Sequence, residues 1–293
     1  MFYQSIEFVT YNKNMENDYY NLMAKLQKLR TTVNNFSIGK STLGEDIWGF
    51  VLGEKTDKRP IIIQAGIHAR EYITSFLLLE MIENLKEKSF DRQIIFVPIV
   101  NVDGVRICFE GYNFIRQDKQ RELIKNLLKN FNKSLFKANA NGVDLNVNFD
   151  ANWGNGKSNV FRPSQENYIG PSPNSENEVK ALINLTNYFN PVLTLSYHSK
   201  GEVIYYGYYG QSNKTKIQQA KLLKVISKTT GYQPIFTKDS AGGYKDWCLL
   251  KKDIVGFTIE VGNDNLSHPI SSQYLKEIFD KNSQVVINLL KEL

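Results

Sequence analysis

The chain has few cysteines and no long apolar runs, and both absences restrict what it can be. Its 293 residues include only Cys108 and Cys248, too few for a disulfide framework. No apolar run approaches the roughly 18 residues of a membrane-spanning helix. The N-terminal residues lack the basic and apolar regions of a signal peptide. We therefore expect a protein that does not enter membranes and that acts in the cytoplasm.

Positive charge is in excess but is not concentrated. Lys and Arg number 36 against 30 Asp and Glu, a formal net charge of +6. No basic stripe with interleaved aromatic residues is present, so we do not expect nucleic-acid binding. Residues 151–158 fit a relaxed phosphate-loop pattern, but they lack the preceding buried strand and the following helix that such a loop requires. Nucleotide binding is therefore not expected either.

Helical and strand patterns alternate along the chain, which is typical of an α/β fold. Helical spacing of apolar residues predicts helices over residues 17–30, 72–86, 118–132, 214–229 and 271–293. It also predicts a helix that begins at residue 175. Apolar runs predict a hairpin over 36–52 and strands over 61–63, 93–100, 192–197, 203–208 and 254–261. Residues 1–15 have weak signals of an edge strand or an extended arm. Ser175 begins a predicted capping box.

The predicted elements fit one compact unit. The chain has no internal repeats and no low-complexity linker, and it is 42% hydrophobic. We expect a single domain over residues 1–293, with a mixed, twisted β-sheet and helices on both of its faces. Residues 140–173 are rich in Asn, Gly, Ser and Pro and predict a long loop. Loops of this length in a compact domain are usually functional.

The segment around His68 indicates a binding site. Three isoleucines at 61–63 are followed by Gly66, by His68 and, three residues later, by Glu71. An apolar burst followed by a helical pattern places His68 and Glu71 where a buried strand passes into a helix. Ligands usually bind at that edge of an α/β sheet. One imidazole and one carboxylate there can bind the same metal ion.

Two further residues complete a catalytic constellation. The three histidines are His68, His198 and His268, and the first two lie just past the ends of predicted buried strands. Two His and one Glu with an open fourth position form the arrangement of a catalytic zinc site. Glu260 lies in an apolar strand, so its pKa should be raised, which suits a general base for a metal-bound water. Taken one at a time, each of these residues is also consistent with a structural hydrogen bond or salt bridge.

The motifs that contain these residues resemble those of the zinc carboxypeptidases of the carboxypeptidase A type. The matching segments, in chain order, are residues 38–44, 68–71, 101–104, 142–149, 197–199, 242–247 and 257–260. The resemblance implies one Zn²⁺ per chain, bound by His68, Glu71 and His198. It also implies that Glu260 is the general acid and base, and that Arg70 contacts the substrate upstream of the scissile bond.

Departures from the family pattern concern the substrate. The family usually has Asn-Arg-Asn in the long loop, where the Asn and Arg side chains bind the terminal carboxylate of the substrate. In this chain Val147 stands in place of the Arg. Only Asn146 can still donate a hydrogen bond to that carboxylate. Lys137 is the best substitute for the Arg that stabilises the oxyanion, although it lacks the two-pronged geometry. The Tyr that closes over the substrate corresponds to Lys238 by loose counting, and we expect Tyr244 to approach the site instead.

Lys245 occupies the family's specificity position. A cation there would favour a carboxylate on the substrate, and the chain in this respect resembles the γ-D-glutamyl-diaminopimelate peptidases of bacterial cell-wall metabolism. Diaminopimelate has a carboxylate at the far end of its side chain. The resemblance implies a metallopeptidase that hydrolyses this bond in peptidoglycan stem peptides through a zinc-activated water, with a peptide or muropeptide as its partner. The other interpretation of Lys245 is a solvated lysine on a loop.

Two other functions remain open. The chain is also consistent with a metallocarboxypeptidase that releases acidic C-terminal residues, with Arg116 or Arg162 binding the terminal carboxylate. The third possibility is an inactive relative that binds wall peptides. The loss of Arg at Val147 favours that idea, but the presence of Glu260 argues against it, because a binding module has no need of the base.

Overall fold

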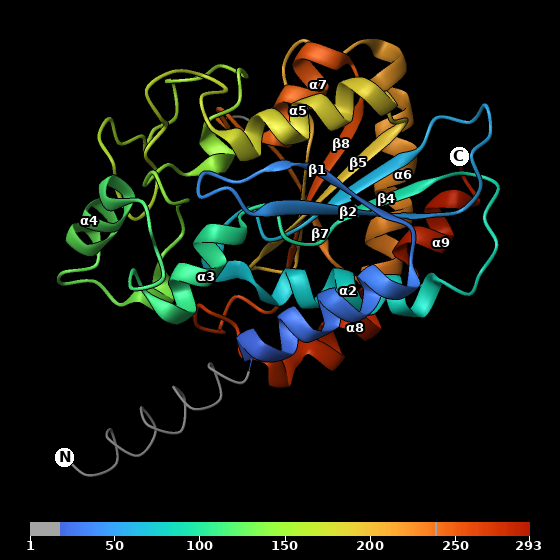
Figure 1. The fold of residues 1–293 in the computed structure, drawn as a ribbon. Helices are drawn as coiled ribbons and strands as arrows, with labels where there is room; N and C mark the ends of the chain where they lie inside the picture. The colour runs from blue at the N-terminus through green and yellow to red at the C-terminus, as the bar shows by residue number, and fades with distance from the viewer. Residues whose placement is uncertain (1–17, 238) are drawn as a thin grey trace.

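One mixed sheet organises the fold, which we describe from a computed structural model that places residues 18–237 and 239–293 (Figure 1). In these ranges eight strands pair in the order β1-β2-β4-β3-β5-β8-β6-β7. Their bounds are β1 Asn35–Lys40, β2 Asp46–Leu52, β3 Ile61–Gln64, β4 Ile94–Val97, β5 Leu193–Ser199, β6 Val203–Tyr206, β7 Gln233–Phe236 and β8 Val255–Val261. The central strands β4, β3, β5 and β8 are parallel, and β2 and β6 flank them antiparallel.

Helices cover both faces of the sheet, so the predicted α/β architecture is confirmed. The helices are residues 18–32, α2 Ile73–Leu85, α3 Val102–Glu110, α4 Asp118–Leu127, α5 Asn177–Phe189, α6 Asn213–Thr230, α7 Tyr244–Lys252, α8 Leu275–Asn282 and α9 Val285–Leu290. In Figure 1, α5 and α7 lie above the sheet, and α2, α8 and the first helix lie below it. The arm predicted over residues 1–15 falls outside the described residues.

The sheet separates two hydrophobic cores. In β3, Ile61 and Ile63 pack in the core on the α2 side, and Ile62 packs in the core beneath α5 and α7. Strands that pack in hydrophobic cores on both faces are typically apolar at consecutive positions, which explains the run of three isoleucines.

Strands β5 and β8 differ from β3 because only one of their faces is apolar. Their odd-numbered residues, Leu193 to Tyr197 and Val255 to Val261, pack in the core on the α2 side. Side chains alternate along a strand, so the even-numbered residues point toward α7. These are Thr194, Ser196, His198, Gly256, Thr258 and Glu260, which we call the polar face of β5 and β8.

Two predictions about helix ends were wrong. Ser175 does not cap α5, which begins at Asn177 without a side-chain cap, because the Ser175 hydroxyl bonds the Glu176 carboxylate instead. The single C-terminal helix predicted over 271–293 is divided into η4 Ser272–Tyr274, α8 and α9. The break after Asn282 allows α8 to pack on α2 and α9 to pack on α6.

Helices α3 and α7 and strand β7 were not predicted. Helix α3 contains Gly104, where a Cβ would lie 2.5 Å from the Ala138 carbonyl oxygen, so close packing and not propensity explains this residue. Helix α7 mixes aromatic and charged residues without a clear stripe. Strand β7 is an exposed edge strand with Pro234, a residue that an edge tolerates.

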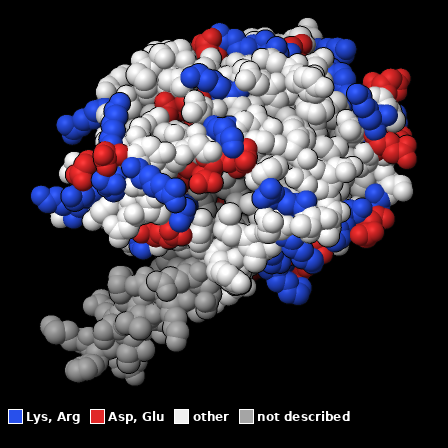
Figure 2. Space-filling model, viewed as in Figure 1, with Lys and Arg blue, Asp and Glu red and all other residues white. Residues whose placement is uncertain are grey.

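The surface agrees with the scattered charge of the sequence. Figure 2 shows Lys and Arg side chains spread over one face of the molecule with Asp and Glu between them. Within the described ranges, no helix combines the length and apolar content needed to cross a membrane.

Candidate active site

A tight turn after β3 sets the positions of His68 and Glu71. Gly66 has φ of +61°, and a Cβ there would lie 2.5 Å from the Ser75 hydroxyl, so glycine is required. The chain then enters the short 3-10 helix η1 (Ala69–Glu71), with His68 at its N-cap. Residues three apart lie on the same side of such a helix. His68 Nδ1 accordingly lies 2.8 Å from Glu71 Oε1.

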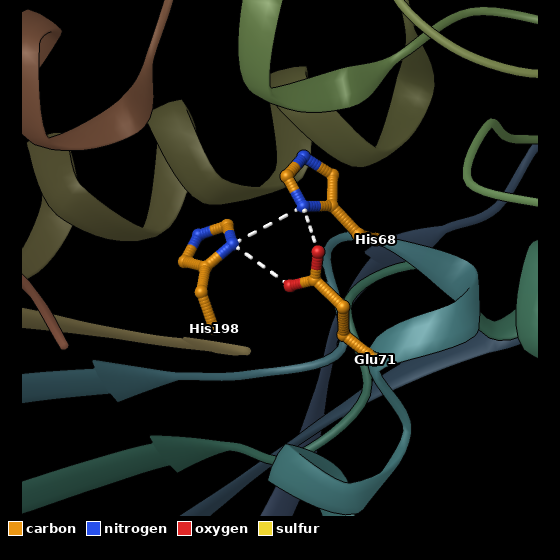
Figure 3. A group of neighbouring side chains, drawn as sticks. All are labelled: His68, Glu71 and His198. Carbon is orange, nitrogen blue, oxygen red and sulfur yellow. Dashed lines mark hydrogen bonds and ion pairs between the residues drawn. The ribbon is translucent and has the colours of Figure 1, made fainter. Parts of the chain in front are cut away.

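His198 approaches this pair from the neighbouring strand. It is the last but one residue of β5, which pairs with β3 in parallel. Its Nδ1 lies 3.2 Å from His68 Nδ1 and 3.1 Å from Glu71 Oε2. Figure 3 shows the three side chains pointing toward one another. The amide of Ser199 also donates to Glu71 Oε2, at 3.2 Å.

The cluster fits a metal ion. The ligand atoms of His68, Glu71 and His198 all lie within 4.8 Å of one another, and all three residues are buried. Two imidazole nitrogens and a carboxylate form the donor set that zinc prefers. Burial acts to raise the pKa of Glu71, but the two imidazoles outweigh it, and the pKa lies well below its usual range. The carboxylate is therefore ionised, as metal binding requires.

Asp144 contacts the nitrogen of His68 that faces away from the cluster and so orients the ring. We did not predict Asp144 as a site residue from the sequence. Its Oδ1 lies 3.2 Å from His68 Nε2, so the other ring nitrogen, Nδ1, faces the cluster. Its Oδ2 lies 2.7 Å from Lys137 Nζ. Despite burial, Lys137 and His68 hold the pKa of Asp144 far below its usual range. Its place in the 142–149 motif, two residues before Asn146, was the available signal.

Lys137, the expected oxyanion stabiliser, therefore lies beside the cluster but is already paired with Asp144. Burial acts to lower the pKa of Lys137, and the Asp144 carboxylate outweighs it, so the pKa is raised. The side chain remains cationic. Its backbone carbonyl also accepts from Ala69, at 3.1 Å, which ties this loop to η1.

Glu260 lies beside His198 across the β5–β8 register. Burial raises the pKa of Glu260 to about 8; the charge of His198 acts against this shift, and the charge of Glu71 adds to it. This direction agrees with the expectation from its apolar strand. A partly buried carboxyl with a raised pKa, next to a metal ligand, is suited to accept and return a proton.

Lys245 is buried, which argues against a solvated loop lysine. Only 5% of the residue is exposed. It lies in the first turn of α7, and its stem passes over Gly256 on the polar face, where a Cβ would lie 3.4 Å from Lys245 Cγ. Its ammonium donates to the Gly207 carbonyl at 3.0 Å and pairs with Asp246. The lysine thus places a cation beneath the polar face.

The long loop brings Asn146 next to the start of α7. Asn146 Oδ1 accepts from the amide of Tyr244 at 3.1 Å. Gly242, with φ of +77°, allows this approach, because a Cβ there would lie 2.3 Å from the Val147 carbonyl oxygen. The side-chain nitrogen of Asn146 can still donate to a ligand. Val147 supplies no charge at the position where the family has Arg.

Tyr244 does not lie where we expected it. Its side chain is fully buried in the core with Phe149 and Trp247, and its hydroxyl lies 2.7 Å from the Thr186 hydroxyl on α5. No surface of Tyr244 remains for a substrate, so the expected contact is corrected: Tyr244 is a core residue. Lys238, the other candidate for this role, lies outside the described residues.

The arginines have different surroundings. Arg70 Nη1 lies 3.1 Å from Glu166 Oε2 and donates to the Leu135 carbonyl at 3.3 Å. Arg162 is exposed on the long loop. Arg116 lines a separate pocket with residues of the α3–α4 segment. Among the described residues, neither Arg116 nor Arg162 has a contact with the metal cluster.

Ser196 and Thr258 are also near the site and were missed. They pair in register two residues below His198 and Glu260, on the same face of the sheet. The signal was the strict alternation of apolar and polar residues in Leu-Thr-Leu-Ser-Tyr-His and Val-Gly-Phe-Thr-Ile-Glu. The alternation indicates one apolar and one polar face, and the burial of both strands places the polar face inside the protein.

Comparison with known proteins agrees with the geometry. The family model described as zinc carboxypeptidase matches residues 19–282. The chain belongs to this family. It is accordingly a zinc-dependent metallopeptidase, and the His-Glu-His cluster fits the ion.

One curated relative and two solved structures resemble the chain over most of its length. The chain is 30% identical over 284 residues to γ-D-glutamyl-L-diamino acid endopeptidase 1 of Lysinibacillus sphaericus, covering 89% of this chain and 69% of that protein. Thrombin-activatable fibrinolysis inhibitor has the same fold, with a TM-score of 0.72, 19% identity, and coverage of 94% of this chain and 73% of that one. Murein-tripeptide amidase MpaA of Escherichia coli O157 aligns with a TM-score of 0.59 and 22% identity, over 88% and 92% of the chains.

Proposed function

We propose that the protein hydrolyses the γ-D-glutamyl–diaminopimelate bond of peptidoglycan stem peptides. The observation that supports this most directly is the buried cation of Lys245 beneath the polar face, together with the absence of an Arg at Val147. The Lys245 ammonium suits a substrate side chain with a negative charge. Without an Arg at position 147, the chain lacks the usual contact with a C-terminal carboxylate. The relative named as a γ-D-glutamyl-L-diamino acid endopeptidase supports the same substrate class.

The residues of the site divide the chemistry among them. His68, Glu71 and His198 would hold the zinc ion, with His68 oriented by Asp144. When bound, zinc acts as a Lewis acid on the scissile carbonyl and lowers the pKa of water. Glu260 takes the proton of the attacking water and returns it to the leaving amine of the diamino acid. Lys137 adds positive charge beside His68, where the Asp144 carboxylate holds it.

Lys245 can present a donor to a charged substrate side chain. An ammonium has three donors, and two of those on Lys245 are used by Gly207 and Asp246. The third is available to a carboxylate. Asp246 can in turn attract the distal ammonium of diaminopimelate, which lies next to that carboxylate.

The test is mass analysis of three synthetic peptides after incubation with zinc-loaded protein. These are L-Ala-γ-D-Glu-diaminopimelate, the same peptide with Lys in place of diaminopimelate, and an α-linked peptide that ends in Glu. We expect release of diaminopimelate from the first peptide, slower cleavage of the second and little cleavage of the third. Faster cleavage of the α-linked peptide would show instead a carboxypeptidase for acidic residues. The Glu260→Gln protein is the matched control for contaminating peptidases.

A further inference from the structure

The loop that follows β6 contributes a tyrosine ring to the surroundings of Lys245. Strand β6 ends at Tyr206, and Gly207 and Tyr208 come directly after it. The Gly207 carbonyl accepts from Lys245 Nζ at 3.0 Å, and the same nitrogen lies over the Tyr208 ring, 5.7 Å from its centroid. A cation within about 6 Å of the centroid is attracted by the face of a tyrosine ring. The ammonium therefore has partners on two sides, this loop and Asp246 of its own helix.

A closed chain of contacts holds the Tyr208 ring beside the ammonium. Only 5% of Tyr208 is exposed. Its hydroxyl donates to the Ser240 carbonyl at 3.2 Å, and the Ser240 hydroxyl donates to Asp246, which pairs with Lys245. Burial raises the pKa of Tyr208 to about 12, so the hydroxyl keeps its proton and remains a donor.

Two buried glutamines connect this loop to the strand beneath Lys245. The Tyr208 amide donates to Gln211 Oε1 at 2.9 Å, and Gln211 Nε2 donates to Gln219 Oε1 of α6 at 3.0 Å. Gln219 Nε2 donates in turn to the Gly256 carbonyl at 2.8 Å. Gly256 is the residue over which the stem of Lys245 passes. The ring and the lysine stem are therefore held by one hydrogen-bonded network, and such networks make a buried region rigid.

A fixed ammonium matters because a lysine side chain is flexible. If the four-carbon stem were ordered only when a substrate binds, the loss of its rotamers would reduce the affinity. In this fold the stem is ordered without a substrate, and Gly207 and Asp246 each use one N–H group. The ring and the Gly207 carbonyl oppose the attraction of the ammonium to Asp246. A carboxylate that reaches Lys245 thus meets a donor that is already in place.

We propose that Tyr208 is a positioning residue for Lys245, and that its ring strengthens the preference for a substrate side chain that ends in a carboxylate. The proposal rests on the proposed function, in which Lys245 binds the distal carboxylate of diaminopimelate. Tyr208 acts through the ammonium and does not touch the reacting atoms. Its effect therefore concerns the binding of one side chain, which changes KM more than kcat.

The experiment compares L-Ala-γ-D-Glu-diaminopimelate with the peptide that has lysine in place of diaminopimelate. Lysine lacks only the distal carboxylate, so the ratio of the two kcat/KM values measures recognition of that group. Tyr208→Leu removes the ring and should lower the ratio by about fivefold, as expected for one cation–π contact, mainly through a higher KM for the diaminopimelate peptide. Tyr208→Phe keeps the ring and should keep the ratio within about twofold of wild type.

Tyr209→Leu is the matched control, because it makes the same change at the next residue, which is 62% exposed. It should leave the ratio unchanged. Damage to the fold alone would lower both kcat/KM values together and would not change their ratio. Lys245→Met should remove the preference, and adding Tyr208→Leu to it should lower the ratio no further, because the ring acts through the ammonium.

Gln219→Met provides a second variant that leaves the ring in the protein and loosens its support. It should lower the same ratio by less than Tyr208→Leu, and it decides the question alone if Tyr208→Leu does not fold. In the Glu260→Gln background, calorimetry with the two peptides should show the same order of preferences without turnover.

An unchanged ratio in Tyr208→Leu and Gln219→Met would overturn the inference, as would equal losses in Tyr208→Leu and Tyr208→Phe. If Lys245→Met removes the preference in that case, the proposed function stands and only the role of Tyr208 fails. If the wild-type protein does not distinguish the two peptides, the proposed role of Lys245 fails, and this inference fails with it.

Discussion

At the scale of single residues, Glu260 is the group whose environment is most clearly suited to a chemical role. It neighbours His198 across two parallel strands, and burial raises its pKa to about 8. We predict that Glu260→Gln keeps the zinc and lowers kcat by about 10²- to 10⁴-fold, the usual contribution of a general base. Steady-state kinetics and metal analysis on the same preparation provide the test.

The matched control for this substitution is Glu87→Gln, which makes the same change at an exposed position. It should leave kcat and zinc content unchanged. Full activity in Glu260→Gln would show that another residue transfers the proton. Loss of zinc in that variant would show instead that Glu260 helps to hold the metal.

Residue patterns predicted the cluster of His68, Glu71 and His198 that the fold brings together, but not the position of Tyr244. His68 and Glu71 follow directly from their spacing at a strand end, and His198 from its position at the end of another strand. Tyr244 was wrongly expected near the substrate, because its direction depends on how α7 packs and not on the motif around it. Its hydroxyl meets Thr186 on α5, a contact between residues far apart in the sequence.

At the scale of elements, a buried carboxyl cluster joins α5 to the loops beside the site. The Glu178 carboxylate accepts from the Thr42 amide at 2.8 Å and from Asn139 Nδ2 at 3.2 Å. Asn139 Nδ2 also donates to Glu176 at 2.8 Å. The cluster therefore holds the β1–β2 turn, the 139–141 segment and the first turn of α5 together. The capping-box prediction failed here because the acidic residues have these long-range partners.

Burial raises the pKa of Glu178 to about 7 from an ordinary value of 4.5. The folded state thus binds the proton more tightly than the unfolded state, so the free energy of unfolding should fall as pH rises from 4.5 to about 7. The loss is roughly 3 kcal/mol and is complete above that range. Glu178→Gln, which resembles the protonated form, should remove this part of the pH dependence.

Urea unfolding of zinc-loaded wild-type and Glu178→Gln proteins at several pH values provides the measurement. The variant should gain stability relative to wild type as pH rises, by up to roughly 3 kcal/mol. Glu87→Gln, on the surface, should show no such trend. A constant difference between the two proteins across the range would mean that Glu178 is not protonated in the folded state.

Some helices and strands could not be predicted from sequence patterns. The continuous apolar run of β3 and the alternation in β5 and β8 both predict strands, but only the alternation indicates that a polar surface lies between β8 and α7. Helix α3 and strand β7 were missed because Gly104 and Pro234 are unfavourable by propensity. Both are tolerated by tertiary context, a close approach to Ala138 in one case and an exposed edge in the other.

At the scale of the whole molecule, the site exists only because distant segments meet. His68 and His198 are 130 residues apart in sequence, and their Nδ1 atoms lie 3.2 Å apart in the fold. The parallel pairing of β3 with β5 and of β5 with β8 brings these ends to one edge of the sheet. The order of the strands could not be derived from local sequence patterns. It depends on how the helices pack against the two faces of the sheet.

A metal ion that joins β3 and β5 should also stabilise the folded chain as a whole. The three ligands come together only in the folded state, so binding adds to the free energy of unfolding. We predict one zinc per chain and a fall in the unfolding temperature of about 10 °C on chelation, which corresponds to a few kcal/mol in a chain of this size. Calorimetry with and without chelator, and native mass spectrometry for the metal, provide the measurements.

Substitution of single proposed ligands distinguishes stabilisation by the metal from destabilisation by the substitution itself. His68→Ala and His198→Ala should lose the zinc, and chelator should then leave their unfolding temperatures unchanged. His268→Ala should keep both the zinc and the response to chelator, because the third histidine lies outside the cluster. If His198→Ala kept a full complement of zinc, β5 would not contribute a ligand. The joining of β3 to β5 would then have to be explained by strand pairing alone.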